Sequence, residues 1–338
     1  MDIPTHAIPL VAPRLRPSQR RSRWKITALG GGHGLHASLK ALRLLDADLT
    51  AIVTVADDGG SSGRIRDEFG VLPPGDLRMA LSALCDDSEW GRIWRDVIQH
   101  RFASTGPLDG HSVGNLLISA LWQIHGDEVD GLDWVARLLR AHGRVLPMSS
   151  LPLTIEADVA DSHGSVGVIR GQSQVAACKG TVSQVRLDPA APPARAETIA
   201  EVEQADVLNL GPGSWYTSVM PHLLVPELAE AICTSSAVKS LTLNLPGASA
   251  ETRGLSLTDH LESLKEHAPG LHFDYILVDE TAAAQEKGLR EAAEKLFSAT
   301  LWERPLAARI RGQHDTLKLA ACYRDMFVNA GLKTDEQW

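Results

Sequence analysis

Two glycine-rich stretches have the residue types that hold a phosphate group through main-chain amides. They are Gly30-Gly31-Gly32-His33-Gly34 and Gly211-Pro212-Gly213-Ser214, and each directly follows an apolar segment. Glycine permits positive φ and close approach of a ligand, and the unpaired amides at a helix start favour negative charge. A phosphate site is therefore expected at each stretch. For the first stretch, a tight turn without a ligand is the alternative.

Asp57 and Asp58 end the second apolar segment, where dinucleotide-binding folds place a carboxylate on a ribose hydroxyl. Ser61-Ser62-Gly63-Arg64 follows with hydroxyls, amides and a guanidinium suited to phosphate or sugar oxygens. Mg²⁺ held by Asp57 and Asp58 is the cofactor that this pattern suggests. A surface turn with solvated carboxylates is the alternative.

Two further segments place polar residues at the start of apolar helices. Asp76 follows Pro73-Pro74-Gly75 and is positioned to cap a helix that runs to Leu84. Residues 110–115 open a strongly apolar helix over 116–124, whose first turn could present His111, Ser112 and Asn115 to a ligand. Each of these signals is weak on its own.

The elements that position these residues follow from hydrophobic periodicity. A buried strand over 25–29, the glycine loop, a helix with leucines at helical spacing, and a strand over 49–55 make one βαβ unit. Strands expected at 205–210, 239–245 and 273–278 alternate with helices at 197–203, 223–233 and 257–267. This alternation predicts an α/β fold with a doubly wound, mostly parallel, Rossmann-like sheet.

An antiparallel β subregion is predicted to interrupt that pattern. Residues 145–187 contain segments of period-2 alternation around a turn, and the proline-rich linker 188–195 returns the chain to the sheet. Residues 1–23 carry five arginines and four prolines, which predicts a flexible basic tail. We expect one domain over 24–335, with the subregion inserted into it.

Composition and missing motifs exclude several classes of protein. The 33 basic and 42 acidic residues give a net charge of -9, which disfavours nucleic acid as a partner. No apolar run is long enough for a membrane span, and the four cysteines lie too far apart for a zinc ribbon or a readable disulfide framework. A cytoplasmic protein fits these features. The chain lacks G-x-G-x-x-G, the P-loop G-K-[ST], G-x-S-x-G and H-E-x-x-H.

Six segments in order carry a resemblance to a known family. They are GGGHGL, TVADDGGSSGRIRDEFG, PPGDLR, GHSVGNLL, RGQSQV and NLGPGSWYTSVMPHLLVP, spread from about residue 25 to residue 260. Together they resemble the CofD superfamily, specifically its bacterial YvcK branch of gluconeogenesis and morphogenesis factors.

The resemblance implies a cytoplasmic protein that binds UDP-N-acetylglucosamine and is needed for cell shape and wall synthesis on gluconeogenic carbon. It implies binding rather than turnover. A second copy of the chain and a regulatory protein of wall synthesis stay open as partners. The related transferase branch moves a phospholactyl group from a guanosine diphospho donor, so a Mg²⁺-dependent transferase of phosphorus-containing groups is the alternative.

The resemblance also implies a set of ligand-binding residues. They are Gly31, Gly32, Gly34, Asp57, Asp58, Ser61, Ser62, Arg64, Asp76, His111, Asn115, Gly211, Gly213, Ser214 and Thr217. His33, which lies among the matching glycines, is a further candidate for ligand binding. This chain departs from the family pattern at three places: His33 stands where threonine is common, Leu255 where an aromatic residue is usual, and Gln313 where an arginine is usual. Arg309 or Arg311 could replace that arginine.

Overall fold

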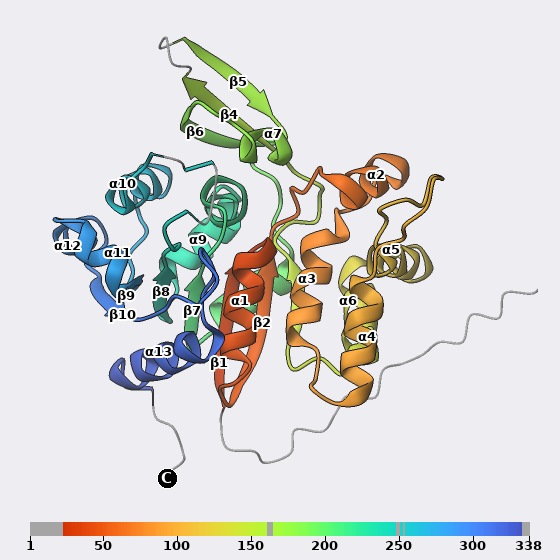
Figure 1. Ribbon diagram of the computed structural model, residues 1–338, viewed down its shortest axis with the longest axis horizontal. Helices are drawn as coiled ribbons and strands as arrows, with labels where there is room; N and C mark the ends of the chain where they lie inside the picture. The colour runs from red at the N-terminus through yellow and green to blue at the C-terminus, as the bar shows by residue number, and fades with distance from the viewer. Residues whose placement is uncertain (1–22, 161–164, 248–250, 253, 333–338) are drawn as a thin grey trace, which may run out of the picture.

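Seven strands form one parallel sheet in this computed structural model, which describes residues 23–160, 165–247, 251–252 and 254–332. The strand order is β10-β9-β8-β7-β1-β2-β3 (Figure 1). The strands are β1 (Trp24–Gly30), β2 (Ala47–Val53), β3 (Arg144–Pro147), β7 (Val207–Leu210), β8 (Val238–Thr242), β9 (Tyr275–Asp279) and β10 (Thr300–Arg304). Strands β7 and β9 are buried along their whole length, as expected for a sheet covered on both faces.

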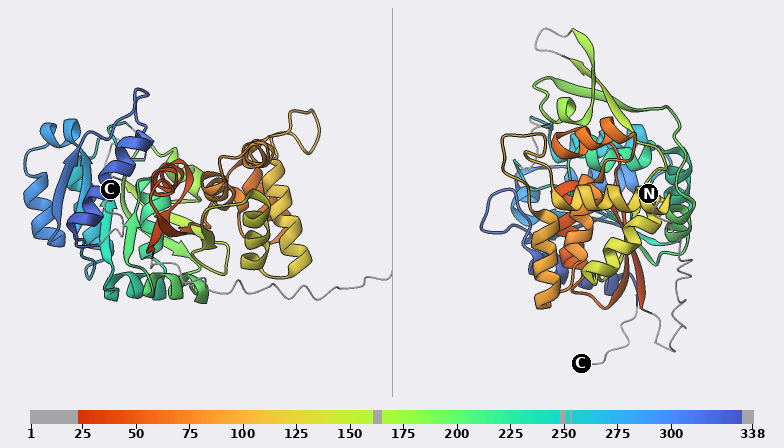
Figure 2. Two further views of the ribbon diagram at one scale, coloured as in Figure 1. Left: turned by 90° about the horizontal axis from the view of Figure 1, so that it is seen from below. Right: turned by 90° about the vertical axis from the view of Figure 1, so that its right-hand side faces the viewer.

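Helices cover both faces of this sheet. In Figure 2, α1 and α13 lie on one face, and α8 and α9 lie on the other. The helices of the first half are α1 (Gly32–Leu42), α2 (Gly60–Phe69), α3 (Pro74–Leu84), α4 (Glu89–Gln99), α5 (Val113–His125) and α6 (Glu128–Leu139). Those of the second half are α8 (Ala196–Glu203), η1 (Trp215–Val219), η2 (Met220–Leu223), α9 (Pro226–Thr234), α10 (Leu257–His267), α11 (Glu280–Gln285), α12 (Leu289–Phe297) and α13 (Thr316–Asn329). The predicted doubly wound α/β fold is confirmed.

The antiparallel subregion is also confirmed, with a later start than predicted. Its three strands are β4 (Thr154–Ala160), β5 (Val166–Arg170) and β6 (Thr181–Asp188), in the order β5-β4-β6, and α7 (Gln172–Ala176) lies between β5 and β6. Residues 144–147, which overlap the predicted subregion, instead pair with β2 in parallel. The apolar Val145 and Leu146 therefore belong to the main core. In Figure 1 the subregion projects beyond the main sheet, beside α2.

The predicted single domain over 24–335 stays a prediction. The predicted tail lies outside the described residues except for Arg23, which pairs with Asp46.

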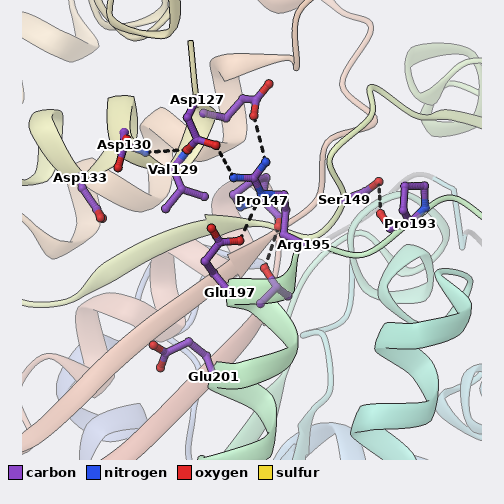
Figure 3. Close-up of polar contacts among 12 residues, drawn as sticks. Asp127, Val129, Asp130, Asp133, Pro147, Ser149, Pro193, Arg195, Glu197 and Glu201 are labelled. Carbon is purple, nitrogen blue, oxygen red and sulfur yellow. Dashed lines mark hydrogen bonds and ion pairs between the residues drawn. The ribbon is translucent and has the colours of Figure 1, made fainter. Parts of the chain in front are cut away.

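Arg195 fixes the end of the linker 188–195 to the body. Its guanidinium lies 2.7 Å from Asp127 Oδ2, 3.3 Å from Glu128 Oε2 and 3.4 Å from Glu197 Oε2 (Figure 3). Ser149 Oγ also donates to the Pro193 carbonyl at 2.8 Å. These contacts hold the returning chain beside β3 and the start of α8.

Replacing Arg195 by alanine should lower the free energy of unfolding by about 1–2 kcal/mol, because three carboxylates would lose their shared cation. The arginine side chain is only 14% exposed, whereas its acidic partners are 32–40% exposed. Urea unfolding measures the change. The control is Arg324→Ala, at an exposed pair with Asp325, and it should change stability by less than about 0.5 kcal/mol. Equal effects of the two substitutions would contradict this account of the linker.

Candidate functional site

The strand order places a topological switch point between β1 and β7. From β1 the sheet extends through β2 to β3 on one side and through β7 to β10 on the other, so the order reverses at β1. Open α/β sheets bind ligands at the carboxyl ends of the strands at such a switch point. Both glycine-rich stretches lie there, since one follows β1 at Gly30 and the other follows β7 at Leu210.

The two glycine loops touch. A Cβ atom built on Gly34 would lie 2.2 Å from the Pro212 carbonyl oxygen and 2.5 Å from Gly213 Cα. Helix α1 begins at Gly32, where φ is +55°, and its N-cap Gly31 makes no side-chain cap. The amides of the first turn of α1, at the switch point, therefore lack intrahelical acceptors.

A buried polar network supports the second glycine loop from below. Ser38 Oγ donates to the Gly211 carbonyl at 2.9 Å, and the Tyr323 hydroxyl lies 3.1 Å from Ser38 Oγ and 2.9 Å from Thr242 Oγ1. Burial raises the pKa of Tyr323 to about 12, so the phenol keeps its proton at neutral pH. The network thus joins α1, β8 and α13 beneath Gly211.

Several donors of the second loop already have internal partners. The Gly213 amide donates to Asn244 Oδ1 at 3.0 Å, and Asn244 Nδ2 donates back to the Gly213 carbonyl at 2.6 Å. The buried carboxylate of Glu251 accepts from the Tyr216 amide at 3.0 Å and from Thr217 Oγ1 at 3.1 Å. Ser214, which is half-buried, is left as the residue of this loop best placed to meet a ligand.

Asp76 faces the first glycine loop from α3. Its carboxylate is 8% exposed, its Oδ2 atom has no hydrogen-bond partner, and a Cβ on Gly31 would lie 2.7 Å from that atom. Burial, and then the negative charge of Asp57, raise the pKa of Asp76 to about 7, against a hydrogen bond from the Gly32 backbone. Asp76 is not the predicted N-cap: α3 begins at Pro74 after the N-cap Pro73, so Asp76 is the third helical residue and reaches across to α1.

The side chains of the adjacent Asp57 and Asp58 point in different directions. Asp57 Oδ1 accepts from the Gly59 amide at 2.9 Å, and its other oxygen lies beside Gly75, close to Asp76. Asp58 Oδ1 accepts from the Ser173 amide at 2.9 Å, so Asp58 faces the antiparallel subregion. The extended chain turns successive side chains to opposite faces, which accounts for the divergence. A shared ion on Asp57 and Asp58 stays a prediction.

Asn115 joins most of the remaining predicted residues into one buried cluster. Its Nδ2 atom donates to Ser61 Oγ at 3.1 Å and lies 3.5 Å from Ser62 Oγ. Ser61 Oγ also lies 3.0 Å from His111 Nδ1. The cluster adjoins Asp76, because Ser62 and Asp57 both lie against Gly75, the residue before it.

Arg78 belongs to this cluster although the sequence did not single it out. It is 4% exposed, and its Nε atom donates to Asn115 Oδ1 at 2.8 Å. Burial lowers the pKa of Arg78 to about 10, which leaves the guanidinium charged at neutral pH. The signal that could have found it is its place in the PPGDLR segment, two residues after Asp76.

Replacing Asn115 by alanine should lower the free energy of unfolding by about 2 kcal/mol, because Arg78 Nε and Ser61 would lose partners inside the protein. Chemical denaturation measures the change. The control is Asn329→Ala, since Asn329 is exposed and, among the described residues, its amide donates only to the Tyr275 hydroxyl. A loss at Asn115 no larger than the loss at Asn329 would show that the cluster is not a structural unit.

Two predicted residues are exposed, unlike the buried cluster. His33 is exposed on α1. Arg64 is also exposed, and its guanidinium donates to the carbonyls of Pro107 at 3.1 Å and Asp109 at 2.6 Å. Arg64 therefore holds the loop between α4 and α5.

The side chains at the site limit how a metal ion could be bound. Across residues 23–332, leaving out those not described, no three His, Cys, Asp or Glu side chains are grouped to hold a metal. Asp57 and Asp76 are two neighbouring carboxylates, and Mg²⁺ commonly binds through one or two carboxylates together with ligand phosphates. The residues therefore fit Mg²⁺ only when a phosphorylated ligand completes its coordination.

Comparison with known proteins identifies the family. Residues 26–304 match the family described as 2-phospho-L-lactate transferase CofD, so the chain belongs to the CofD family. A relative from Mycobacterium tuberculosis, named "Putative gluconeogenesis factor", is 46% identical over 312 residues, which are 89% of this chain and 91% of the relative. The "Gluconeogenesis factor" of Listeria monocytogenes is 37% identical over 268 residues, covering 79% of this chain and 81% of that protein.

A solved structure agrees with the fold. The crystal structure of a UPF0052 family protein from Bacillus halodurans superposes with a TM-score of 0.79 at 33% identity, covering 90% of this chain and all of that one. No helix among the described residues is both long and apolar enough to cross a membrane.

Proposed function

We propose that the protein binds a nucleoside diphosphate sugar, UDP-N-acetylglucosamine, across the crevice between β1 and β7. The observation that carries the proposal is the contact of the two glycine loops at the switch point of the sheet. The first-turn amides of α1 and the side chain of Ser214 would donate to the diphosphate. The residue cluster around Asp57 and Asn115 forms one wall of this site.

Under this proposal the protein is a regulator, and occupancy of the crevice adjusts cell morphogenesis and wall synthesis during gluconeogenic growth. The names of the relatives in Mycobacterium and Listeria support the metabolic part of this role. All four cysteines are free thiols, which supports a cytoplasmic location. A partner protein of wall synthesis and a homo-oligomer stay predictions.

Isothermal titration with UDP-N-acetylglucosamine, UDP and NAD, with and without Mg²⁺, tests the proposal. We expect saturable binding of UDP-N-acetylglucosamine, weaker binding of UDP and no binding of NAD. A ligand present at about 100 times its Kd should also stabilise the folded state by about 2.7 kcal/mol, which a thermal scan detects. No heat and no thermal shift at millimolar UDP-N-acetylglucosamine would contradict the proposal.

A transferase activity is the second candidate, and the unpaired Asp76 carboxylate favours it. A pKa of about 7 lets Asp76 accept or release a proton near neutral pH, beside the loop that would hold a phosphate. Mg²⁺, held by Asp57 and Asp76 or by the predicted pair Asp57 and Asp58, would neutralise charge on the phosphates. An acceptor hydroxyl would attack the β-phosphorus and lose its proton, and a nucleoside monophosphate would leave.

Mg²⁺-dependent release of a nucleoside monophosphate from a nucleoside diphospho donor tests this candidate. Release that requires Asp57 and Asp76 would establish the activity. If no nucleoside monophosphate is released with a panel of donors and hydroxyl acceptors, the regulatory function is the one candidate that remains.

A further inference from the structure

The outer strand of the antiparallel subregion, β5, has a free edge. The strand order β5-β4-β6 places β5 at one side of the small sheet, and among the described residues it pairs only with β4. Figure 1 shows β5 along the outside of the projecting subregion. An unpaired edge strand presents a row of backbone donors and acceptors that another strand can bind.

The opposite edge of the subregion, at β6, is covered by the body of the protein. The Val185 amide donates to His267 Nε2 of α10 at 3.1 Å, and the Tyr216 hydroxyl of η1 donates to the Val182 carbonyl at 3.3 Å. Side chains of α10 and η1 thus bind backbone groups of β6. Within the described part of the chain, the outer edge of β5 has no such contact. The two edges of the subregion therefore differ, and β5 is the one open to another strand.

One hydrogen bond sets which groups of β5 point outward. The Gly171 amide, directly after β5, donates to the Ile155 carbonyl of β4 at 2.7 Å. In an antiparallel pair, residues that bond the neighbouring strand alternate with residues that point away from it. The odd-numbered residues of β5 share the alternation of Gly171 and bond β4. The backbone amides and carbonyls of Val166, Val168 and Arg170 therefore point to the free edge, and none of them has a partner among the described residues.

The side chains of the same three residues make this edge apolar and free of unpaired charge. Val166 is 68% exposed and Val168 is 62% exposed. The guanidinium of Arg170, at the end of the strand, already pairs with Glu156 and Asp188. Edge strands commonly avoid pairing through a lysine, a proline or a bulge, and β5 has none of these.

Charge and geometry favour a second copy of β5 as the occupant of this edge. The acidic neighbour of Val168 on β4 is Asp158, whose carboxylate pairs with Arg186 at 2.8 Å. Because these charges are neutralised within one chain, the edge suits a β-branched strand without free charge, and β5 is such a strand. A two-fold axis at Val168 places Val168 of the two copies opposite each other and Arg170 of one copy opposite Val166 of the other. Each outward amide and carbonyl then gains a partner, and no two arginines face each other.

We propose that β5 pairs with β5 of a second copy of this chain, antiparallel and centred on Val168, so that the two subregions form one continuous sheet. A strand of five residues buries less area than a stable interface needs, so this dimer is weak and reversible. The interface lies close to the candidate ligand site, because the Ser173 amide, shortly after β5, donates to Asp58.

Disulfide formation by Val168→Cys tests the register of this pairing. Two residues that face each other in a hydrogen-bonded antiparallel pair have Cα atoms about 5.5 Å apart, within the range of a disulfide. With oxidised glutathione, Val168→Cys should give a disulfide-linked dimer on a non-reducing gel. The matched control is Val166→Cys, because the two copies of residue 166 would lie about 13 Å apart along the strands. A linked fraction no greater in Val168→Cys than in Val166→Cys or the wild type would overturn the proposal.

Sedimentation velocity of the full chain tests the dimer without a covalent bond. The wild type should pass from monomer to dimer over a range of about 1–200 µM protein. Val168→Lys places two cations opposite each other and should raise the Kd of the dimer about tenfold or more. The matched control is Gln184→Lys, which adds the same charge to the exposed face of β6, on the far side of β4, and should leave the Kd unchanged. A wild type that stays monomeric throughout this range, or equal effects of the two lysines, would overturn the proposal.

Discussion

Replacing Gly34 by alanine should weaken binding of UDP-N-acetylglucosamine by about a hundredfold, the largest effect on affinity that we expect. The added Cβ would lie 2.2 Å from the Pro212 carbonyl oxygen, so the two glycine loops would have to separate. Separation moves the amides of α1 away from Ser214, and each hydrogen bond lost to a charged phosphate costs about 1.5–3 kcal/mol. Isothermal titration measures the loss.

The control for Gly34 is Gly106→Ala. A Cβ on Gly106 meets nothing within 4 Å, and this glycine lies in the loop before α5. Its substitution should leave both binding and stability unchanged. Gly34→Ala should also lower the free energy of unfolding by about 1–3 kcal/mol, as overpacking does. A Gly34→Ala variant that folds and binds like the wild type would show that the contact of the loops is irrelevant to the ligand.

Replacing Asp76 by asparagine should remove a dependence on pH from both stability and binding. The pKa of Asp76 is raised to about 7 in the folded protein, above its ordinary value of 3.8. Between those pH values the folded state keeps a proton that the unfolded chain releases, so stability falls as pH rises toward 7 and then levels off. Asp76→Asn should therefore be more stable than the wild type at pH 8, by about 2–4 kcal/mol, and equal to it near pH 4.

The affinity for the ligand should also depend on whether the Asp76 carboxyl is protonated. A diphosphate beside Asp76 raises the pKa of that carboxyl further, so without Mg²⁺ the affinity should fall above pH 7 by up to about tenfold per pH unit. Asp76→Asn should abolish this slope. With Mg²⁺ the slope should reverse, because the cation needs the ionised carboxylate. Asp325→Asn, at an exposed position, is the control. If affinity depends on pH in Asp76→Asn as it does in the wild type, the role of the Asp76 carboxyl is refuted.

The fold could be predicted because its signals are local. Buried strands such as 25–29 read as short apolar runs, and the glycines mark where β1 and β7 end. The predicted helix at 257–267 has the observed bounds of α10, where Ser256 and Asp259 form a capping box. The start of the subregion was wrong because the short strand β3 reads like any alternating segment, and its pairing with β2 depends on the tertiary structure.

The site could be predicted only in outline. The positions of the two glycine loops at the ends of β1 and β7 could be predicted, because each loop directly follows an apolar segment. The partners of Asp58 and Arg64 did not follow, because they come from the Ser173 amide and the loop carbonyls of Pro107 and Asp109, which only the folded chain brings near. The sequence also did not predict that Asn244 and Glu251 accept hydrogen bonds from backbone amides of the second loop.

A crystal structure of the protein with UDP-N-acetylglucosamine tests the central claim most directly. We expect diphosphate oxygens within hydrogen-bond distance of the first-turn amides of α1 and of Ser214 at the same time. A diphosphate bound at one loop only, or elsewhere on the molecule, would contradict it.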